Sequence, residues 1–208
     1  MKKIAITGNI ASGKSLLEAY FKKSGNITLC LDKVTDEIYK DAKFQESLKK
    51  IFNTTNRNEI SNIVFSNKAK LKTLEGLILP LIKQKMFNFF DENINEKIVF
   101  VCAPTLFEAG FEIYFDEIIF VSASENIRKE RLIKRNNLSC EKALNKINSQ
   151  IKECEKIPKC NYIIENNGTK EEFLAKIDKL KVKLNIPWLI CTPLQLKFLS
   201  CQYQVQAP

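Results

Sequence analysis

The feature that most constrains this chain is a short glycine-containing segment near its N-terminus. Residues 8–15 read Gly-Asn-Ile-Ala-Ser-Gly-Lys-Ser and fit the pattern G-x-x-x-x-G-K-[ST]. The β-branched run before it, Ile4–Thr7, predicts a strand, and the apolar periodicity of Ser15–Lys23 after it predicts a helix. In this order, the amides of the loop bind phosphate at the positive end of the helix. The segment predicts a nucleotide phosphate-binding loop (P-loop), with a chance glycine turn as the alternative.

Each polar or glycine position of this loop has a physical role. Gly8 and Gly13 permit positive φ and close backbone approach, so that consecutive N–H groups converge on a phosphate. Lys14 supplies a point charge for the β and γ oxygens, and the Ser15 hydroxyl can ligate Mg²⁺. We therefore expect ATP and Mg²⁺ as ligands. The loop residues expected to bind the nucleotide are Gly8, Asn9, Ala11, Ser12, Gly13, Lys14, Ser15 and Leu16.

The remaining chain alternates strand and helix patterns, which predicts an α/β fold with a parallel sheet. Further strands are expected at residues 27–31, 98–102, 118–121 and 162–164, and helices at 124–134, 139–155 and 169–184. Thr169 and Glu172 have the spacing of a capping box. Residues 43–92 show only helical patterns, with Pro80 expected to kink or divide them. The expected architecture is a three-layer α/β/α P-loop fold with five parallel strands, a helical insertion and a lid.

Charged side chains at the expected sheet edge suggest what happens to the nucleotide. Asp32 follows the second strand, where its carboxylate can accept a hydroxyl proton or orient that hydroxyl; a helix N-cap is the alternative. Arg128, Arg131 and Arg135 share one helix face and suit transferring phosphates, although a solvated basic face is favoured for Arg128. Glu108 can orient an acceptor or a metal-bound water, or be a surface carboxylate.

Composition narrows the class of protein. The 208 residues, 45% hydrophobic, suit one compact unit. The absence of histidine removes Ser-His-Asp triads and histidine zinc sites. The net charge of +9 favours binding of polyanions, or it reflects an ordinary lysine-rich surface. Seven cysteines without a Cys-x-x-Cys pair indicate reduced thiols in a cytoplasmic protein. We find no signal peptide and no apolar run long enough for a membrane span.

The ordered motifs of residues 1–184 resemble the dephospho-CoA kinase family. They are the P-loop Thr7–Ser15, Asp32, Leu79-Pro80-Leu81-Ile82, Pro104–Glu108, Arg131–Arg135 with Gln150, and Ile164-Glu165-Asn166-Asn167-Gly168. The resemblance implies ATP-dependent phosphorylation of the ribose 3′-hydroxyl of dephospho-CoA, the last step of coenzyme A biosynthesis. It implies Lys14, Asp32 and Arg135 as catalytic residues, with Asp32 as the base, and places Asn166 and Gly168 near the adenine. The acceptor residues it implies are Asp32, Pro80, Leu106, Glu108 and Arg131.

The resemblance also implies how the chain is divided. We expect one kinase domain at residues 1–184, with a nucleotide core (1–42 and 96–184), a helical substrate region (about 43–95) and a lid (about 128–155). Residues 185–208 form an extension without an assigned role. The expected partners are ATP and dephospho-CoA, with no nucleic acid or membrane, in a monomer or weak homo-oligomer.

Departures from the family pattern leave alternatives open. Cys30, Leu79, Lys146 and the pair Cys160-Asn161 stand where the family usually has Asp, His, Arg and Ala-Asp. One alternative is another small-molecule or nucleoside monophosphate kinase. Another, from a different class, is a non-catalytic or nucleic-acid-associated P-loop protein, although the basic and aromatic residues are not interleaved as in single-strand binders.

Overall fold

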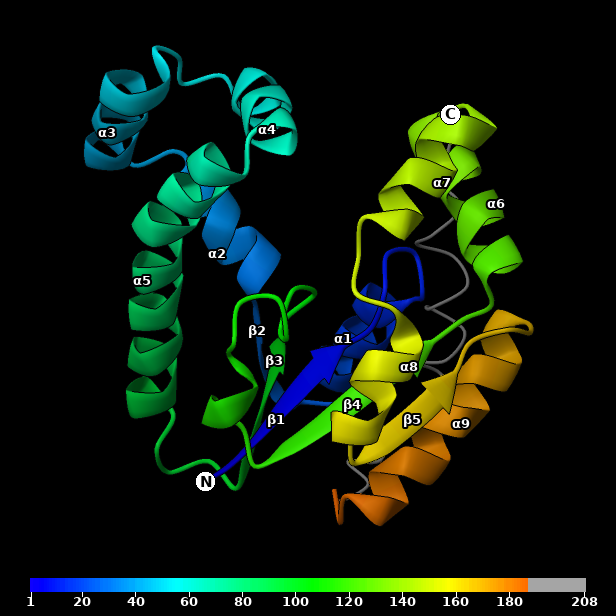
Figure 1. Cartoon of the computed structure of the whole chain (residues 1–208). Helices are drawn as coiled ribbons and strands as arrows, with labels where there is room; N and C mark the ends of the chain where they lie inside the picture. The colour runs from blue at the N-terminus through cyan, green and yellow to red at the C-terminus, as the bar shows by residue number, and fades with distance from the viewer. Residues whose placement is uncertain (187–208) are drawn as a thin grey trace.

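The computed structural model describes residues 1–186 and shows a five-stranded parallel sheet between two helical layers (Figure 1). The strands have the order β2-β3-β1-β4-β5. They are β1 (Lys2–Thr7), β2 (Ile27–Cys30), β3 (Ile98–Cys102), β4 (Glu117–Ser122) and β5 (Tyr162–Glu165). The parallel α/β/α architecture expected from the alternating pattern is confirmed.

The sheet is buried on both faces, as the continuous apolar run Ile98–Cys102 predicts. One face packs against α1 (Lys14–Lys23) and α9 (Lys170–Lys183), with Phe21 stacked on Phe100 at 4.1 Å between ring centroids. The other face packs against α2 (Leu31–Ile38) and α5 (Lys68–Glu92). Because all the strand pairs are parallel, the carboxyl ends of the five strands share one edge.

The insertion between β2 and β3 forms one arm of the molecule (Figure 1). It consists of α2, α3 (Ala42–Phe52), α4 (Arg57–Ser66) and α5. The sequence predicts that Pro80 kinks or divides this helical run; helix α5 runs through it without interruption, so the division is wrong and the kink stays a prediction. Ile78 and Ile82 on either side of Pro80 are buried in the core, and this packing compensates for the hydrogen bond that the proline nitrogen cannot donate.

A second arm contains α6 (Glu125–Asn136) and α7 (Cys140–Asn148), followed by the short α8 (Glu153–Lys156). Two 3₁₀ turns complete the described elements, at Glu112–Tyr114 and Ile157–Lys159. The single helix expected at 139–155 is wrong, because the chain leaves helical geometry after α7. There the Gln150 side chain accepts a hydrogen bond from the Ile10 amide of the P-loop at 2.6 Å. This tertiary contact outweighs the local helical pattern.

The capping box at the start of α9 is confirmed. The Thr169 hydroxyl accepts from the Glu172 amide, and the Glu172 carboxylate accepts from the Thr169 amide. Within residues 1–186 no helix has the length and apolar character of a membrane span. The extension expected at residues 185–208 lies, from residue 187 onward, outside the described residues.

Candidate active site

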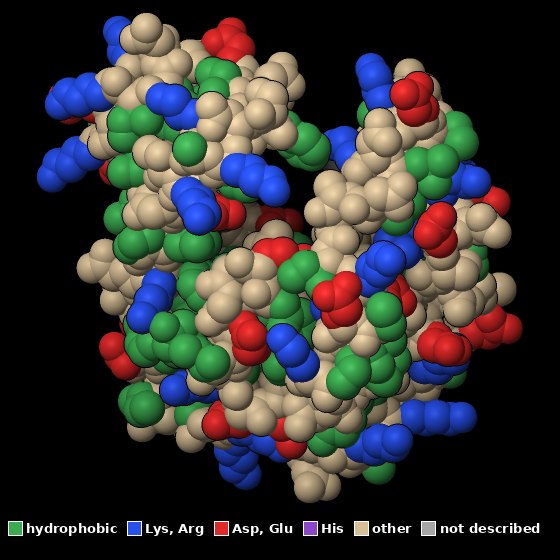
Figure 2. All heavy atoms as spheres, in the orientation of Figure 1, with side chains coloured by type: hydrophobic (Ala, Val, Ile, Leu, Met, Phe, Trp, Pro, Cys, Tyr) green, Lys and Arg blue, Asp and Glu red, His purple; other side chains and the backbone are tan. Residues whose placement is uncertain are grey.

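A cleft of about 700 Å³ opens at the carboxyl edge of the sheet, and a hollow between the two arms is visible in Figure 2. The P-loop and the first turn of α1 form one wall, Asp32 of α2 another, and α6 the third. The predicted site residues that line this cleft are Ala11, Gly13, Lys14, Ser15, Leu16, Asp32, Arg131, Arg135, Asn166 and Gly168. Residues up to 157 positions apart in the sequence therefore meet in one space.

The P-loop has the backbone conformation that its glycines predict. Gly8 has φ +146° and Gly13 has φ +109°. A Cβ on Gly13 would lie 2.1 Å from the Asn166 amide nitrogen, and one on Gly8 would lie 2.2 Å from the Val121 carbonyl oxygen. Only glycine fits at these two positions. The same Asn166 amide donates to the Ser12 carbonyl at 2.8 Å, which fixes the loop against the end of β5.

Lys14 lies almost wholly within the loop. Its Nζ donates to the carbonyl oxygens of Gly8 at 2.8 Å and Asn9 at 3.0 Å. Burial removes water from the ammonium group and lowers the pKa of Lys14 to about 8, although Cys102 and Asp32 oppose this shift. The loop therefore holds a partly desolvated cation beside the cleft, where an anionic ligand gains most from it.

Asp32 lies in the first turn of α2, immediately after β2. The cap position of this helix belongs to Cys30, so the interpretation of Asp32 as an N-cap is wrong. Burial raises the pKa of the Asp32 carboxyl, and the positive charge of Lys14 opposes the rise. The geometry thus places a carboxylate with increased proton affinity in the same cleft as the P-loop lysine.

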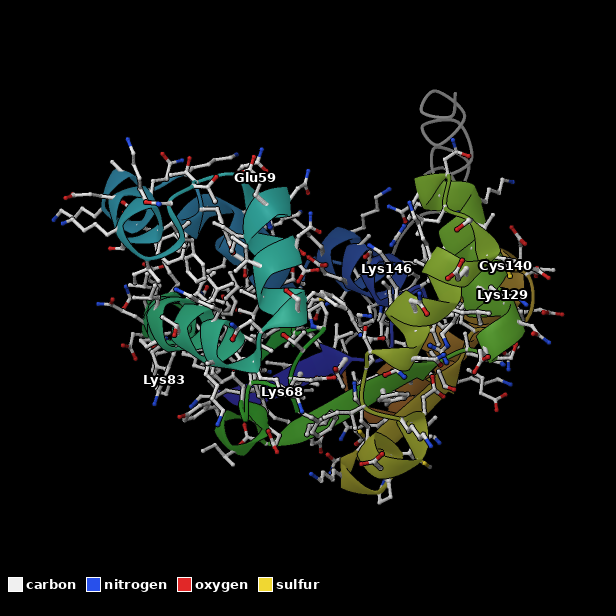
Figure 3. The ribbon with its side chains drawn as sticks, turned by 45° about the horizontal axis from the view of Figure 1, so that its top comes forward. Glu59, Lys68, Lys83, Lys129, Cys140 and Lys146 are labelled. Carbon is white, nitrogen blue, oxygen red and sulfur yellow. The ribbon has the colours of Figure 1, made fainter. Side chains whose placement is uncertain are left out.

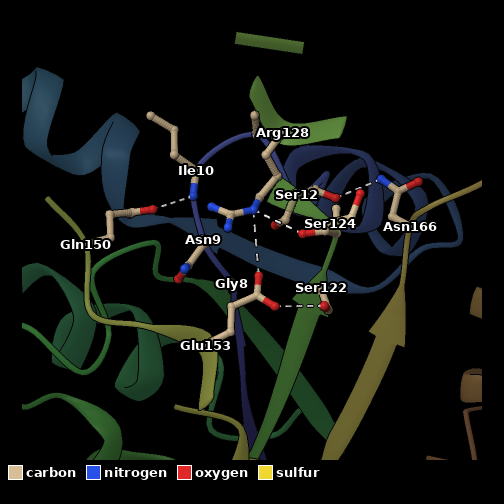
Figure 4. A network of polar contacts seen from close by, with 12 residues as sticks. Gly8, Asn9, Ile10, Ser12, Ser122, Ser124, Arg128, Gln150, Glu153 and Asn166 are labelled. Carbon is tan, nitrogen blue, oxygen red and sulfur yellow. Dashed lines mark hydrogen bonds and ion pairs between the residues drawn. The ribbon is translucent and has the colours of Figure 1, made fainter. Parts of the chain in front are cut away.

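The three arginines of α6 have different environments, and Figure 4 shows that of Arg128. Arg131 donates to the Asn166 carbonyl at 3.0 Å and to the P-loop carbonyls of Ala11 and Ser12 at 3.4 Å. Arg128 is buried, donates to the Ala123 carbonyl and pairs with Glu153 at 3.8 Å; its expected solvated position is wrong. Arg135 lies one turn after Arg131 on α6, and its side chain is exposed on the wall of the cleft.

A small apolar cluster joins the second arm to the P-loop. Leu132, Ala143 and Ile147 form its core, and Ile10 and Ala11 at the tip of the loop pack against it. Figure 3 shows Lys146 on the side of α7 that faces the gap between the arms, and Lys129 on the outer side of α6. A movement of this arm would therefore be transmitted directly to the loop.

One part of the site carried no signal in the sequence. The Lys156 side chain is 1% exposed, and its Nζ donates to Glu108 Oε1 at 2.6 Å and to Asn9 Oδ1 at 3.1 Å. Glu108 is therefore an ion-pair partner of Lys156 and not a free surface carboxylate. Lys156 lies 147 residues from Asn9 in a polar segment, where nothing distinguishes a buried lysine from a solvated one.

The predicted site residues that do not line the main cleft are Gly8, Asn9, Ser12, Pro80, Leu106 and Glu108. Leu106 is fully buried and lines a small cavity of about 30 Å³ that Asp32 also borders. Pro80 is exposed on α5 and lines no described pocket, whereas the neighbouring Leu79 lines the small cavity. Asn161, which stands where the family usually has Asp, accepts a hydrogen bond from the Ile118 amide at 2.8 Å.

Cys30 and Cys102 form the cleft floor between the P-loop and Asp32. They are register partners on neighbouring strands, and their sulfur atoms lie within 4.8 Å of each other. The neighbouring Cys102 thiol lowers the pKa of Cys30 to about 7, and the Cys30 thiol together with burial raises the pKa of Cys102. The sequence gives no reason to pair these two residues, because they lie 72 positions apart.

The fold and the site together define a P-loop kinase. A Bacteroides thetaiotaomicron shikimate kinase shares this fold, with a TM-score of 0.50 and 13% identity over 89% of this chain and 99% of that one. The Campylobacter jejuni dephospho-CoA kinase structure is more similar, with a TM-score of 0.68 and 27% identity over 88% of this chain and 98% of that one. A Thermus thermophilus structure has a TM-score of 0.76 and 29% identity over 88% of this chain and 97% of that one.

Sequence comparison identifies the family. The dephospho-CoA kinase family model matches residues 2–172. The Rickettsia bellii dephospho-CoA kinase is 34% identical over 88% of this chain and 98% of its own length. The Fusobacterium nucleatum dephospho-CoA kinase is 32% identical over 85% of this chain and 95% of its own length. This chain belongs to the dephospho-CoA kinase family and is an ATP-dependent kinase of coenzyme A biosynthesis. The resemblance noted in the sequence is confirmed, and the alternative classes are not favoured.

Proposed function

We propose that this chain transfers the γ-phosphoryl group of ATP to the ribose 3′-hydroxyl of dephospho-CoA, with Asp32 as the base. The observation that carries the assignment of roles is that Asp32 and Lys14 share one cleft and perturb each other's pKa. The acceptor oxygen bonds to the γ-phosphorus while the bond to the ADP oxygen breaks, and Asp32 accepts the hydroxyl proton.

The P-loop and α6 supply the positive charge that this reaction needs. Backbone amides of residues 8–13 and the Lys14 ammonium hold the β and γ phosphates. Arg135, exposed on the opposite wall, contacts the transferring group when the second arm closes. Arg131 acts through the loop, because its guanidinium already binds the backbone of Ala11, Ser12 and Asn166.

The donor set at the start of α1 fits Mg²⁺. The Ser15 hydroxyl is exposed on the cleft wall next to Lys14, and a hydroxyl together with phosphate oxygens is the hard-oxygen environment that Mg²⁺ prefers. We therefore assign Ser15 to hold the ion. When bound, Mg²⁺ neutralises phosphate charge.

The two arms divide the remaining tasks. We propose that the helical region 43–95 with Leu106 selects the acceptor, and that residues 128–155 form the lid. Pro80 and Glu108 act indirectly: Pro80 through the packing of Leu79 on the cavity beside Asp32, and Glu108 through Lys156. Asn166 and Gly168, which line the cleft, are assigned to the nucleotide. The division of the chain into core, substrate region and lid stays a prediction, and residues 185–208 are given no role.

We further propose that the protein acts in the cytoplasm as a monomer or weak homo-oligomer. Its described cysteines are free thiols, which suits a reducing compartment. The proposed catalytic residues Lys14, Asp32 and Arg135 line one cleft of the same chain.

The test is product analysis after mixing the protein with MgATP and dephospho-CoA. We expect an acceptor mass gain of about 80 Da, the size of a transferred phosphoryl group. ADP release should depend on dephospho-CoA and be absent with AMP, CMP or shikimate. ADP release with one of those acceptors instead, and no mass gain on dephospho-CoA, would overturn the acceptor assignment.

A further inference from the structure

Three potential metal ligands meet beneath the floor of the active cleft. They are Glu18 of α1, Cys30 at the end of β2 and Cys102 at the end of β3, and their ligand atoms all lie within 4.8 Å of one another. Within residues 1–186, no other group of three carboxylate or thiol side chains lies so close together. We call this group the Glu18–Cys30–Cys102 cluster.

The fold brings these ligands together from rigid elements. Cys30 and Cys102 are partners in the parallel register, so their side chains emerge side by side at the carboxyl edge. Glu18 lies one turn after Lys14 on the helix that packs over these strands. Cys102 is 2% exposed and Glu18 is 9% exposed, which keeps their side chains confined. A preformed arrangement of this kind reduces the entropy cost of binding an ion.

We propose that the Glu18–Cys30–Cys102 cluster binds one thiophilic divalent cation of the Zn²⁺ class. Tetrahedral bonds of about 2.3 Å to sulfur and about 2.0 Å to oxygen place ligand atoms roughly 3.5–4 Å apart. The cluster reaches that spacing with side-chain movements of about 1 Å. Two thiolates and one carboxylate fill three positions, and water from the cleft fills the fourth. Binding releases the thiol protons.

The chemistry of the cluster separates it from the proposed Mg²⁺ position at Ser15. Thiolate sulfur selects soft or borderline cations, whereas Mg²⁺ requires oxygen ligands in an octahedron. The cluster also has two routes to solvent. Cys30 and Cys102 line the main cleft, and Glu18 and Cys30 line a second depression of about 330 Å³ between α1, α2 and α5. An ion can therefore enter even when nucleotide fills the cleft.

Cobalt(II) is the probe for this site, because thiolate coordination gives it charge-transfer absorption and tetrahedral ligation gives it strong visible bands. The protein should carry Cys191→Ser and Cys201→Ser, so that thiols outside the described residues do not bind the probe. We expect one Co²⁺ per chain with the tetrahedral thiolate spectrum, lost on adding Zn²⁺ and retained in excess Mg²⁺. The titration needs neither ATP nor an acceptor, so its failure leaves the kinase assignment intact.

Two substitutions locate the ion, and one serves as a control. Cys30→Ser and Glu18→Gln should each weaken Co²⁺ binding by about tenfold or more, and Cys30→Ser should also reduce the charge-transfer band. Cys140→Ser, at the exposed start of α7 away from the cleft floor (Figure 3), should leave the titration unchanged. Circular dichroism checks that each variant is folded. An octahedral spectrum in the parent protein, or an unchanged titration in Cys30→Ser, would overturn the proposal.

Discussion

Lys156 and Glu108 form an ion pair of 2.6 Å in which the two partners have unequal access to water. The Lys156 side chain is 1% exposed, whereas that of Glu108 is 27% exposed. The lysine also holds Asn9 of the P-loop at 3.1 Å. The pair connects the turn after β3 to the phosphate-binding loop through α8.

The unequal burial predicts an unequal cost of breaking this pair. Glu108→Ala leaves a buried ammonium without its counter-charge and should destabilise the protein by about 3 kcal/mol. Lys156→Met leaves a carboxylate that water can reach and should cost only about 1 kcal/mol. Urea unfolding of both variants measures the difference. Equal losses, or a greater loss in Lys156→Met, would contradict this account.

Gly13→Ala should abolish nucleotide binding. The new Cβ would lie 2.1 Å from the Asn166 amide nitrogen, and φ is +109°. Gly76→Ala is the matched control, because Gly76 lies inside α5 with nothing within 4 Å of an added Cβ. It should stabilise the protein by about 0.5–1 kcal/mol. Nucleotide titration calorimetry and thermal melts measure the two effects. ATP affinity retained in Gly13→Ala would refute the strain argument.

Asp32→Asn should lower kcat by a factor of about 10²–10⁴ while changing ATP affinity little, because it removes proton acceptance and leaves the P-loop intact. Burial raises the pKa of Asp32, so activity should fall as pH drops through this raised value. In the variant, the residual activity should not show this fall at acidic pH. A rate–pH profile that keeps the same fall in Asp32→Asn would remove Asp32 from the role of base.

Lys14 should make the ligand-free protein more stable at alkaline pH. Its pKa is 10.5 in the unfolded chain and about 8 when folded, so between these values the unfolded state binds the extra proton. The free energy of unfolding therefore rises with pH across this range, by up to about 3 kcal/mol for this group. Lys14→Met should lose that contribution and also lose activity. Denaturant unfolding of both proteins at pH 7.5 and about pH 10 tests this, and identical pH dependence would rule it out.

The sequence by itself determined the P-loop, the parallel α/β order and the capping box, because each depends on neighbouring residues whose spacing fixes local geometry. It also placed Lys14 and Asp32 in one cleft, since the ends of parallel strands share an edge. Only the tertiary structure decided that Arg128 is buried, that Gln150 interrupts a helix and that Lys156 pairs with Glu108. It likewise brought Cys30 and Cys102 together across neighbouring strands. These outcomes depend on the burial of charged side chains and on contacts between residues far apart in the chain, and a local pattern specifies neither.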